Sequence, residues 1–137
     1  MGSFNHNIDV KGRMNFPTKL REILGDSFIV TKGLDECLFV YSKEEWAVLE
    51  EKIKAIPLSK GRVLQRFFFS GASEIESDKQ GRILIPQPLR EYAGLEKDIV
   101  VIGASNRAEI WDKAKWDALG GNISQDMVES AMDELGF

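Results

Sequence analysis

Short apolar runs and alternating stretches recur along the chain, separated by turns that contain glycine. Phe4, His6 and Ile8 alternate with polar residues, and continuous apolar runs of four residues follow later. Alternation and short apolar runs are typical of β-strands. In the first half they predict strands over 4–8, 13–16, 28–31 and 38–41. Gly12 supplies the turn between the first two strands, since glycine enters left-handed backbone conformations at little cost, and these strands are expected to form a hairpin.

Longer apolar spacings predict helices between and after these strands. A short helix is predicted over 17–24, with proline at its start and glycine after its end. Ser42 followed by Glu45 forms a capping box, which predicts a helix over 42–56 with an apolar stripe. A further helical pattern over 59–69 contains three consecutive phenylalanines. That segment is expected to be buried on several sides and to bridge the two halves of the chain.

The second half of the chain repeats the first. The stretch Asp9-Val10-Lys11-Gly12-Arg13, followed by Pro17 and Leu20-Arg21-Glu22, recurs 69 residues later as Asp78-Lys79-Gln80-Gly81-Arg82, Pro86 and Leu89-Arg90-Glu91. Gly25 and Gly94 close the two copies, and Tyr41 with Trp46 corresponds to Trp111 with Trp116. The second copy therefore predicts strands over 74–76, 82–85, 99–102 and 108–111, a short helix over 86–92, and a final helix capped by Asp112. This is a tandem duplication of one supersecondary unit.

Strands this short cannot bury their apolar faces alone, so the two halves must close on each other. The expected fold class is mainly β with helices (α+β): an intertwined, pseudo-two-fold β-barrel with helices outside. Arg13 and Arg82 would then lie close together on one face. The expected organisation is a first repeat over 4–57, a connecting helix over 58–72, a second repeat over 73–119, and an acidic tail over 120–137. Glycines 120 and 121 are expected to end the last helix after Leu119, and the tail to be either a weakly docked helix or frayed.

The composition does not alter the predicted fold, but the positions of the charged residues show where charge is concentrated along the chain. The hydrophobic content of 43% is enough for a core, and the formal net charge is −4. Counted by segment, residues 9–21 carry +3 and residues 78–90 carry +2, whereas the chain from Asp112 onward carries −4. This segregation makes the two repeated turns candidates for an anion-binding surface.

The single cysteine, Cys37, excludes an internal disulfide, and its apolar neighbours predict a plain buried thiol. No apolar stretch approaches the length of a membrane span, and the first residues lack the layout of a signal peptide. The chain is therefore expected to be soluble and cytoplasmic.

Catalytic chemistry finds little support. His6 is the only histidine, so a nucleophilic triad depends on it alone, and one His with one Cys does not make a metal site. Asp9 and Asp78 are followed by Val or Lys and then Gly-Arg, unlike the acids of an aspartic dyad. The chain contains no glycine-rich phosphate-binding motif. We expect no enzyme activity, catalytic residue, metal, cofactor or small-molecule substrate.

The repeated turns remain the candidate site. Asp9 and Asp78 are expected to bond the backbone two residues on, with Gly12 and Gly81 at the turn. Arg21 and Arg90, each followed by Glu, are expected to form structural ion pairs or a solvated face. Arg13 and Arg82 have two readings that can hold together: pairing with the aspartate four residues back, or contact with a ligand. A two-stranded ribbon fits the DNA major groove and arginine reads guanine edges and phosphates, so with Lys11 and Lys79 a nucleic-acid surface is the leading hypothesis.

Several motifs together resemble the MraZ family of bacterial transcriptional regulators, encoded at the head of the division and cell-wall gene cluster. They are the two Asp-x-x-Gly-Arg copies, Gly33-Leu34-Asp35 before Cys37-Leu38-Phe39, Glu44-Glu45-Trp46, Phe67-Phe68-Phe69-Ser70-Gly71-Ala72-Ser73-Glu74 and Glu109-Ile110-Trp111. The similarity runs from about His6 to Trp116. It departs from the family pattern at the polar Asn15, at a shortened segment 58–66, and in the tail beyond Leu119.

The resemblance implies a fold of the AbrB/SpoVT swapped-hairpin type, with two such units fused in one chain. It implies ring-shaped homo-oligomers that bind double-stranded DNA at direct repeats upstream of the family's own operon, a repressor role, and association with nucleoid DNA. The DNA-contacting arginine of the first motif would be Arg13, with Arg82 as its counterpart. We expect the first motif to dominate, since it carries more positive charge and Asn15. The rival hypothesis is a protein-interaction or scaffold module whose basic hairpins dock an acidic partner.

Overall fold

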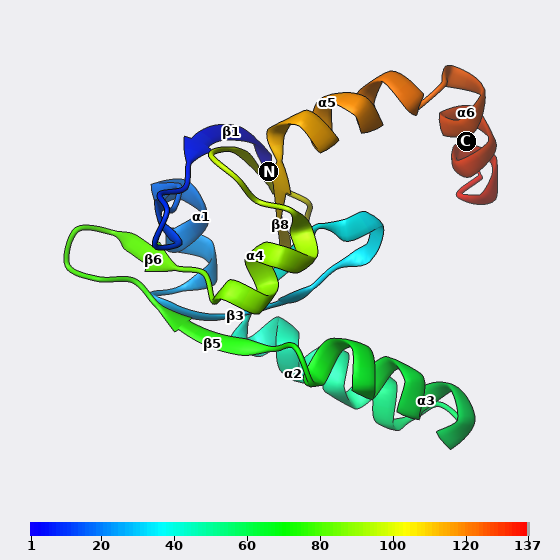
Figure 1. The fold of residues 1–137 in the computed structure, drawn as a ribbon. Helices are drawn as coiled ribbons and strands as arrows, with labels where there is room; N and C mark the ends of the chain where they lie inside the picture. Colours follow the sequence, from blue (N-terminus) through cyan, green and yellow to red (C-terminus); the bar gives the residue numbers. More distant parts are fainter. Residues whose placement is uncertain (137) are drawn as a thin grey trace.

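The computed structural model describes residues 1–136 (Figure 1). The first repeat comprises β1 (Gly2–Asn7), β2 (Arg13–Asn15), α1 (Thr18–Leu24), β3 (Ser27–Lys32), a 3-10 turn (Leu34–Glu36), β4 (Leu38–Ser42) and α2 (Lys43–Lys54). A connecting segment follows, with α3 (Leu58–Leu64) and a π-helical stretch (Gln65–Phe69). The second repeat comprises β5 (Ser73–Glu76), β6 (Arg82–Leu84), α4 (Gln87–Ala93), β7 (Asp98–Gly103), β8 (Ala108–Asp112) and α5 (Lys113–Asn122), followed by α6 (Gln125–Glu134).

The two repeats interlock through their strands. One antiparallel sheet has the order β1-β7-β8-β4-β3-β5, and a second consists of β2 and β6. Each outer strand of the larger sheet pairs with the other repeat: β1 lies beside β7, with Gly2 opposite Gly103, and β5 lies beside β3. The predicted α+β class built from two intertwined repeats is confirmed.

The hairpin expected between the strands over 4–8 and 13–16 is only partly formed. The strands before and after the first turn share only an isolated bridge between Ile8 and Met14 and the hydrogen bond from Asp9 N to the Arg13 carbonyl at 2.9 Å. Beyond these contacts they separate, so that β1 joins β7 while β2 pairs with β6. Each turn therefore connects two different sheets, and the returning strand completes its ladder with the equivalent strand of the other repeat.

The main core lies between the large sheet and the β2–β6 ribbon. Met14 and Ile83 are opposite each other in that ribbon, and both are buried. Phe16, just after β2, stacks on Phe28 of β3 with ring centroids 5.0 Å apart. Because side chains alternate between the two faces of a strand, the ribbon's other face is left for solvent.

A second apolar cluster lies on the other side of the large sheet, under the helices. Tyr41 contacts Trp46 at 5.8 Å between ring centroids, and Trp111 contacts Trp116 at 5.5 Å. The equivalence of these pairs is confirmed, since each joins the last strand of a repeat to the helix that follows it. Cys37 also belongs to this cluster. It is fully buried as predicted, and burial raises the pKa of its thiol to about 12.

The helices mostly follow the sequence pattern. The Ser42 hydroxyl accepts a hydrogen bond from the backbone of Glu45 at 3.1 Å, which confirms the cap of α2. The bridging helix is present, but its last five residues form a π-helix that the sequence did not predict. The predicted break after Leu119 was wrong, because α5 continues to Asn122. The tail forms α6, and none of the helices within residues 1–136 is long and apolar enough to cross a bilayer.

The π-helical stretch is tied to the large sheet by one buried hydroxyl. Thr31 is fully buried, and its Oγ1 donates to the Phe68 carbonyl at 2.5 Å. Thr31→Val keeps the side-chain shape but deprives that carbonyl of its donor, so we expect a loss of about 1–3 kcal/mol in the free energy of unfolding. Denaturant unfolding checks this, with Thr31→Ser, which keeps the hydroxyl, as the comparison. An unchanged midpoint for Thr31→Val would show that the bond contributes nothing.

Candidate nucleic-acid interface

Each repeated turn is held by its aspartate. Asp9 Oδ1 accepts hydrogen bonds from the backbone N–H groups of Lys11 and Arg13, both at 2.9 Å. Asp78 Oδ1 accepts the equivalent bonds from Gln80 and Arg82, also at 2.9 Å. These backbone donors, above all the N–H groups of Arg13 and Arg82, hold the pKa of both carboxyls below the usual value. The two acids thus stay ionised and rigidify the turns, which differs from a role in proton transfer.

The turn glycines have two separate requirements. Gly12 has φ 91° and Gly81 has φ 77°, a region that side-chain-bearing residues rarely adopt. A Cβ on Gly12 would also lie 2.6 Å from Arg90 Nε and 2.7 Å from the Ile85 carbonyl oxygen. At Gly81 the nearest atoms are those of the Arg21 guanidinium, at 2.9 Å. Each glycine therefore makes room for an arginine of the other repeat.

This packing corrects the expected role of Arg21 and Arg90. Neither forms an ion pair within residues 1–136 in the structure; instead each bonds backbone carbonyls or hydroxyls. Arg90 Nε donates to the Ile85 carbonyl at 3.0 Å and a second nitrogen reaches the Val10 carbonyl at 3.4 Å. Arg21 Nε donates to the Phe16 carbonyl at 3.3 Å. Both arginines stabilise the turns from beneath rather than facing solvent as a charged helix surface.

The exposed face of the β2–β6 ribbon brings the predicted arginines together. Arg13 lies opposite Leu84, and Asn15 lies opposite Arg82. Arg13, Asn15 and Leu84 are exposed and Arg82 is partly exposed. Arg13 and Arg82 are thus diagonal neighbours on one face, a relation that usually separates residues by about 7–8 Å. Lys11 and Lys79 are exposed within the two turns.

The two arginines differ in their partners. Arg82 Nε donates to Asp78 Oδ2 at 3.0 Å, so this arginine is paired with its own aspartate. Within the described residues, the side chain of Arg13 has neither a hydrogen-bond nor an ion-pair partner. Of the two alternatives left open by the sequence, self-pairing therefore applies to the second copy. Arg13 is the arginine whose guanidinium can meet a ligand without first leaving a carboxylate.

Lys97 adds a cation that sequence reasoning missed. Together with Asn7, Asp9, Arg13, Asn15 and Arg82, it lines a shallow depression beside the ribbon. Its backbone carbonyl accepts from Ile8 N at 2.8 Å, and in the other repeat the Asp26 carbonyl accepts from Ser77 N at 3.0 Å. Lys97 therefore corresponds to Asp26, at an offset of 71 instead of 69. The two extra residues after Gly94 hide this equivalence from a search at constant spacing.

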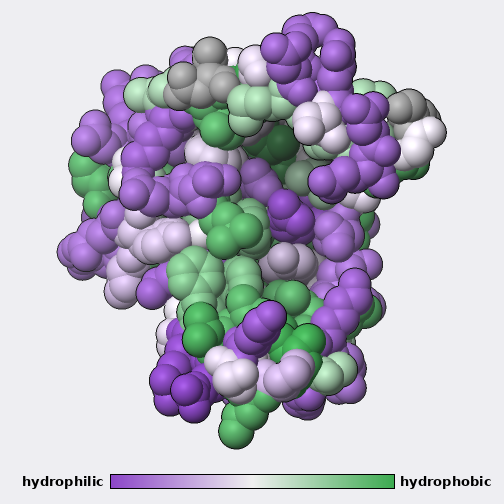
Figure 2. All heavy atoms as spheres, turned by 90° about the vertical axis from the view of Figure 1, so that its right-hand side faces the viewer, coloured by the Kyte–Doolittle hydropathy of each residue, from purple (hydrophilic) through white to green (hydrophobic). Residues whose placement is uncertain are grey.

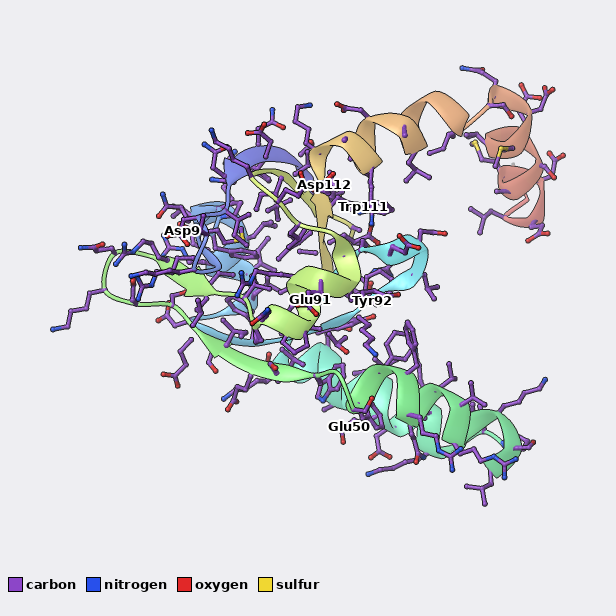
Figure 3. The ribbon with its side chains drawn as sticks, viewed as in Figure 1. Asp9, Glu50, Glu91, Tyr92, Trp111 and Asp112 are labelled. Atoms are coloured by element: carbon purple, nitrogen blue, oxygen red, sulfur yellow. The ribbon has the colours of Figure 1, made fainter. Side chains whose placement is uncertain are left out.

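The charge difference between the two turns follows directly. The first has three cations, Lys11, Arg13 and Lys97, against the single carboxylate of Asp9. The second has Lys79 and Arg82 against Asp78 and Asp26. Both turns lie at the left end of the molecule in Figures 1 and 3, where Asp9 is labelled, and α2, α3, α5 and α6 extend to the right. The surplus positive charge is therefore concentrated at one turn, at the end opposite these four helices.

The other titratable candidates form no second cluster within residues 1–136. His6 lies in β1 opposite Ile99, and partial burial lowers the pKa of its imidazole. Among the described residues no three His, Cys, Asp or Glu side chains come together as metal ligands. The turns and the β2–β6 ribbon form the cationic surface of the candidate site.

Known proteins match this chain over its whole length. A family model described as "MraZ protein, putative antitoxin-like" matches residues 1–64 and 68–135. A protein of Heliobacterium modesticaldum named "Transcriptional regulator MraZ" is 61% identical over 100% of this chain and 97% of its own length. Proteins of the same name from Desulforamulus reducens and Acetivibrio thermocellus are 60% and 55% identical, over 98% and 99% of this chain and 99% and 98% of their own lengths. The chain, with its two interlocked repeats and paired Asp-x-x-Gly-Arg turns, belongs to the MraZ family.

Proposed function

We propose that this chain is a sequence-specific DNA-binding transcriptional regulator that contacts the duplex through the β2–β6 ribbon and its two turns. The observation that carries the proposal is the exposed face on which Arg13, Asn15 and Arg82 lie together, beside Lys11 and Lys97. A two-stranded ribbon fits the major groove, where arginine reads guanine and asparagine reads adenine. The names of the relatives support the same function.

The first turn leads this contact. Arg13 needs to break no ion pair to reach a base or phosphate, whereas Arg82 must exchange Asp78 for the DNA. The backbone bonds to Asp9 fix the start of β2, so less conformational freedom is lost when the arginine binds. Asn15 stands where the second copy has Leu84, so only the first strand offers an amide on this face.

One chain alone is a weak ligand for DNA. Its net charge is −4, and only three cations cluster at the first turn. We propose that it acts as a ring-shaped homo-oligomer on direct repeats upstream of the division and cell-wall gene cluster. Binding several linked sites at once can raise affinity by about 10²–10⁴-fold without a new kind of contact. Repeats spaced near one helical turn, about 34–36 Å, would present successive sites on one side of the duplex.

A nuclease footprint on the DNA upstream of the protein's own operon tests this proposal. The expected result is a set of protected segments at regular spacing, absent from a shuffled sequence of the same composition. The proposed repressor role predicts that a reporter driven by this DNA rises when the gene is deleted. If the protein gives no footprint and retains an acidic protein partner after nuclease treatment, the rival hypothesis of a protein-interaction module is favoured instead.

Binding should weaken steeply as salt rises. Each phosphate contact contributes roughly −0.9 to the slope of log K against log salt concentration. Lys11→Ala and Lys97→Ala should each flatten the slope by about one contact for every bound subunit. Lys79→Ala, the matched change at the second turn, should alter the slope less. Fluorescence anisotropy across a salt series measures all three, and equal effects at Lys79 and Lys97 would contradict the leading role of the first turn.

A further inference from the structure

The last helix, α6, carries an apolar face that remains largely exposed among the residues that the structure describes. No residue of α6 is buried, although Met127, Val128, Met132 and Leu135 at its end are large and apolar. Met127 is 58% and Met132 is 42% exposed. In a helix, residues 128, 132 and 135 fall on one side, the spacing by which amphipathic helices anchor in a groove. An apolar helix face of this kind marks an interaction surface.

A second uncovered apolar surface lies on the connecting segment. Leu58 and Val63 of α3 are 72% and 60% exposed, and Leu64 and Phe67 beside them are only partly buried. Figure 2 shows apolar side chains gathered over the lower part of this face of the molecule, which corresponds to the end formed by α2 and α3 in Figure 1. The two apolar surfaces belong to separate arms, since α6 lies at the upper right of Figure 1 and α3 at the lower right.

Opposite charges border the two surfaces. The segment from Leu58 to Phe69 carries Lys60, Arg62 and Arg66 and no acidic residue. The α6 helix carries Asp126, Glu129, Asp133 and Glu134 and no basic residue. Within the part of the chain that the structure describes, no ion pair engages a member of either set. Complementary charge of this kind steers association and fixes which surfaces meet.

We propose that α6 of one copy docks on the α3 surface of a second copy of this chain. Its apolar face covers Val63, Leu64 and Phe67, and its carboxylates face Arg62 and Arg66. The two surfaces differ, so the contact is head-to-tail, and contacts of that type generate a ring when the rotation between copies closes. Methionine is suited to such a surface because its flexible side chain fills irregular gaps. The proposal deepens the assembly put forward above and rests on that part of the proposed function.

The test measures the mass of the full-length protein by sedimentation velocity. Val128→Asp with Met132→Asp should reduce the assembly to single chains, because the added carboxylates would have to be buried against apolar side chains. The matched control is Ser130→Asp, which adds the same group to the polar side of α6 and should leave the mass unchanged. Circular dichroism should show both variants folded, since α6 contributes no buried residue.

A charge reversal identifies the partner surface. Arg62→Glu with Arg66→Glu should also give single chains, and adding Glu129→Arg with Asp133→Arg to the same protein should restore the wild-type mass. The proposal is overturned if wild type is itself a single chain, if the α6 or α3 variants assemble as wild type does, or if the reversed protein fails to recover. If the variants still assemble and still give the footprint, the proposed interface is ruled out but the proposed DNA-binding function stands. If the wild type gives no footprint but the variants lose assembly, the interface is supported and the proposed DNA-binding function is ruled out.

Discussion

Replacing Arg13 by alanine is expected to weaken binding to the upstream DNA strongly while leaving the fold intact. A bidentate arginine contact to a base contributes about 1–3 kcal/mol, or roughly 5–150-fold in affinity for each bound subunit. Simultaneous contacts by several subunits multiply that loss. Stability should not change, because the Arg13 side chain is exposed and contacts no partner among residues 1–136.

Arg82→Ala is the matched comparison, since it removes the same group from the same face. We expect a smaller loss of affinity, because Arg82 is held by Asp78 at 3.0 Å. Anisotropy with labelled upstream DNA measures both affinities, and thermal unfolding checks that both proteins are folded. An Arg13→Ala protein that binds like wild type at moderate salt would refute the site, and equal losses at the two positions would refute the asymmetry between the turns.

Gly12→Ala is expected to be the most destabilising single change at the turns. Its positive φ alone costs about 1–2 kcal/mol for a residue with a Cβ. The added Cβ would also lie 2.7 Å from the Ile85 carbonyl oxygen, whose strand is fixed by the bond from Ile85 N to the Gly12 carbonyl at 2.8 Å. Because this hydrogen bond holds the two backbone segments together, neither can easily move away from the added Cβ. We therefore expect a total loss of about 3 kcal/mol or more in the free energy of unfolding.

Gly81→Ala should be milder, at about 1–2 kcal/mol, the cost of the positive φ. The atoms that its Cβ would meet belong to the Arg21 side chain, which can rotate away. Denaturant unfolding of the two variants gives the comparison. A larger loss at Gly81 than at Gly12 would show that the arginine packing, rather than the backbone approach, limits these turns.

Hydrophobic patterning and the 69-residue repeat predicted most of the elements, because both depend on local residue order. They could not predict which strand β1 and β2 would pair with. Alternation tells which side chains face inward, but Met14 is equally buried whether its strand pairs with β1 or with β6. The swapped pairing was available only through the family resemblance.

The misjudged details of the site have the same origin. Arg21 and Arg90 were interpreted from the glutamates beside them in sequence, whereas each packs on a turn of the other repeat. The repeat could not identify Lys97, because its counterpart in the first half, Asp26, has the opposite charge and lies 71 residues away instead of 69. The pairing of Arg82, and the lack of a partner for Arg13 among the described residues, depend on side-chain positions around nearly identical turns. The residues around Arg13 and Arg82 in the sequence are too similar to predict this difference.

The exchange of outer strands also constrains how the chain is made. Because β1 pairs with β7, the ladder between them cannot form until the ribosome has synthesised and released the chain as far as Gly103. The first repeat meanwhile can build only the β3–β4 pair, whose two edges still lack β5 and β8. Contacts this distant in sequence slow folding, and an open edge can accept the matching strand of another chain. On a polysome, neighbouring nascent chains therefore compete with each chain's own second half, and the short connection through α3 favours the chain that folds on itself.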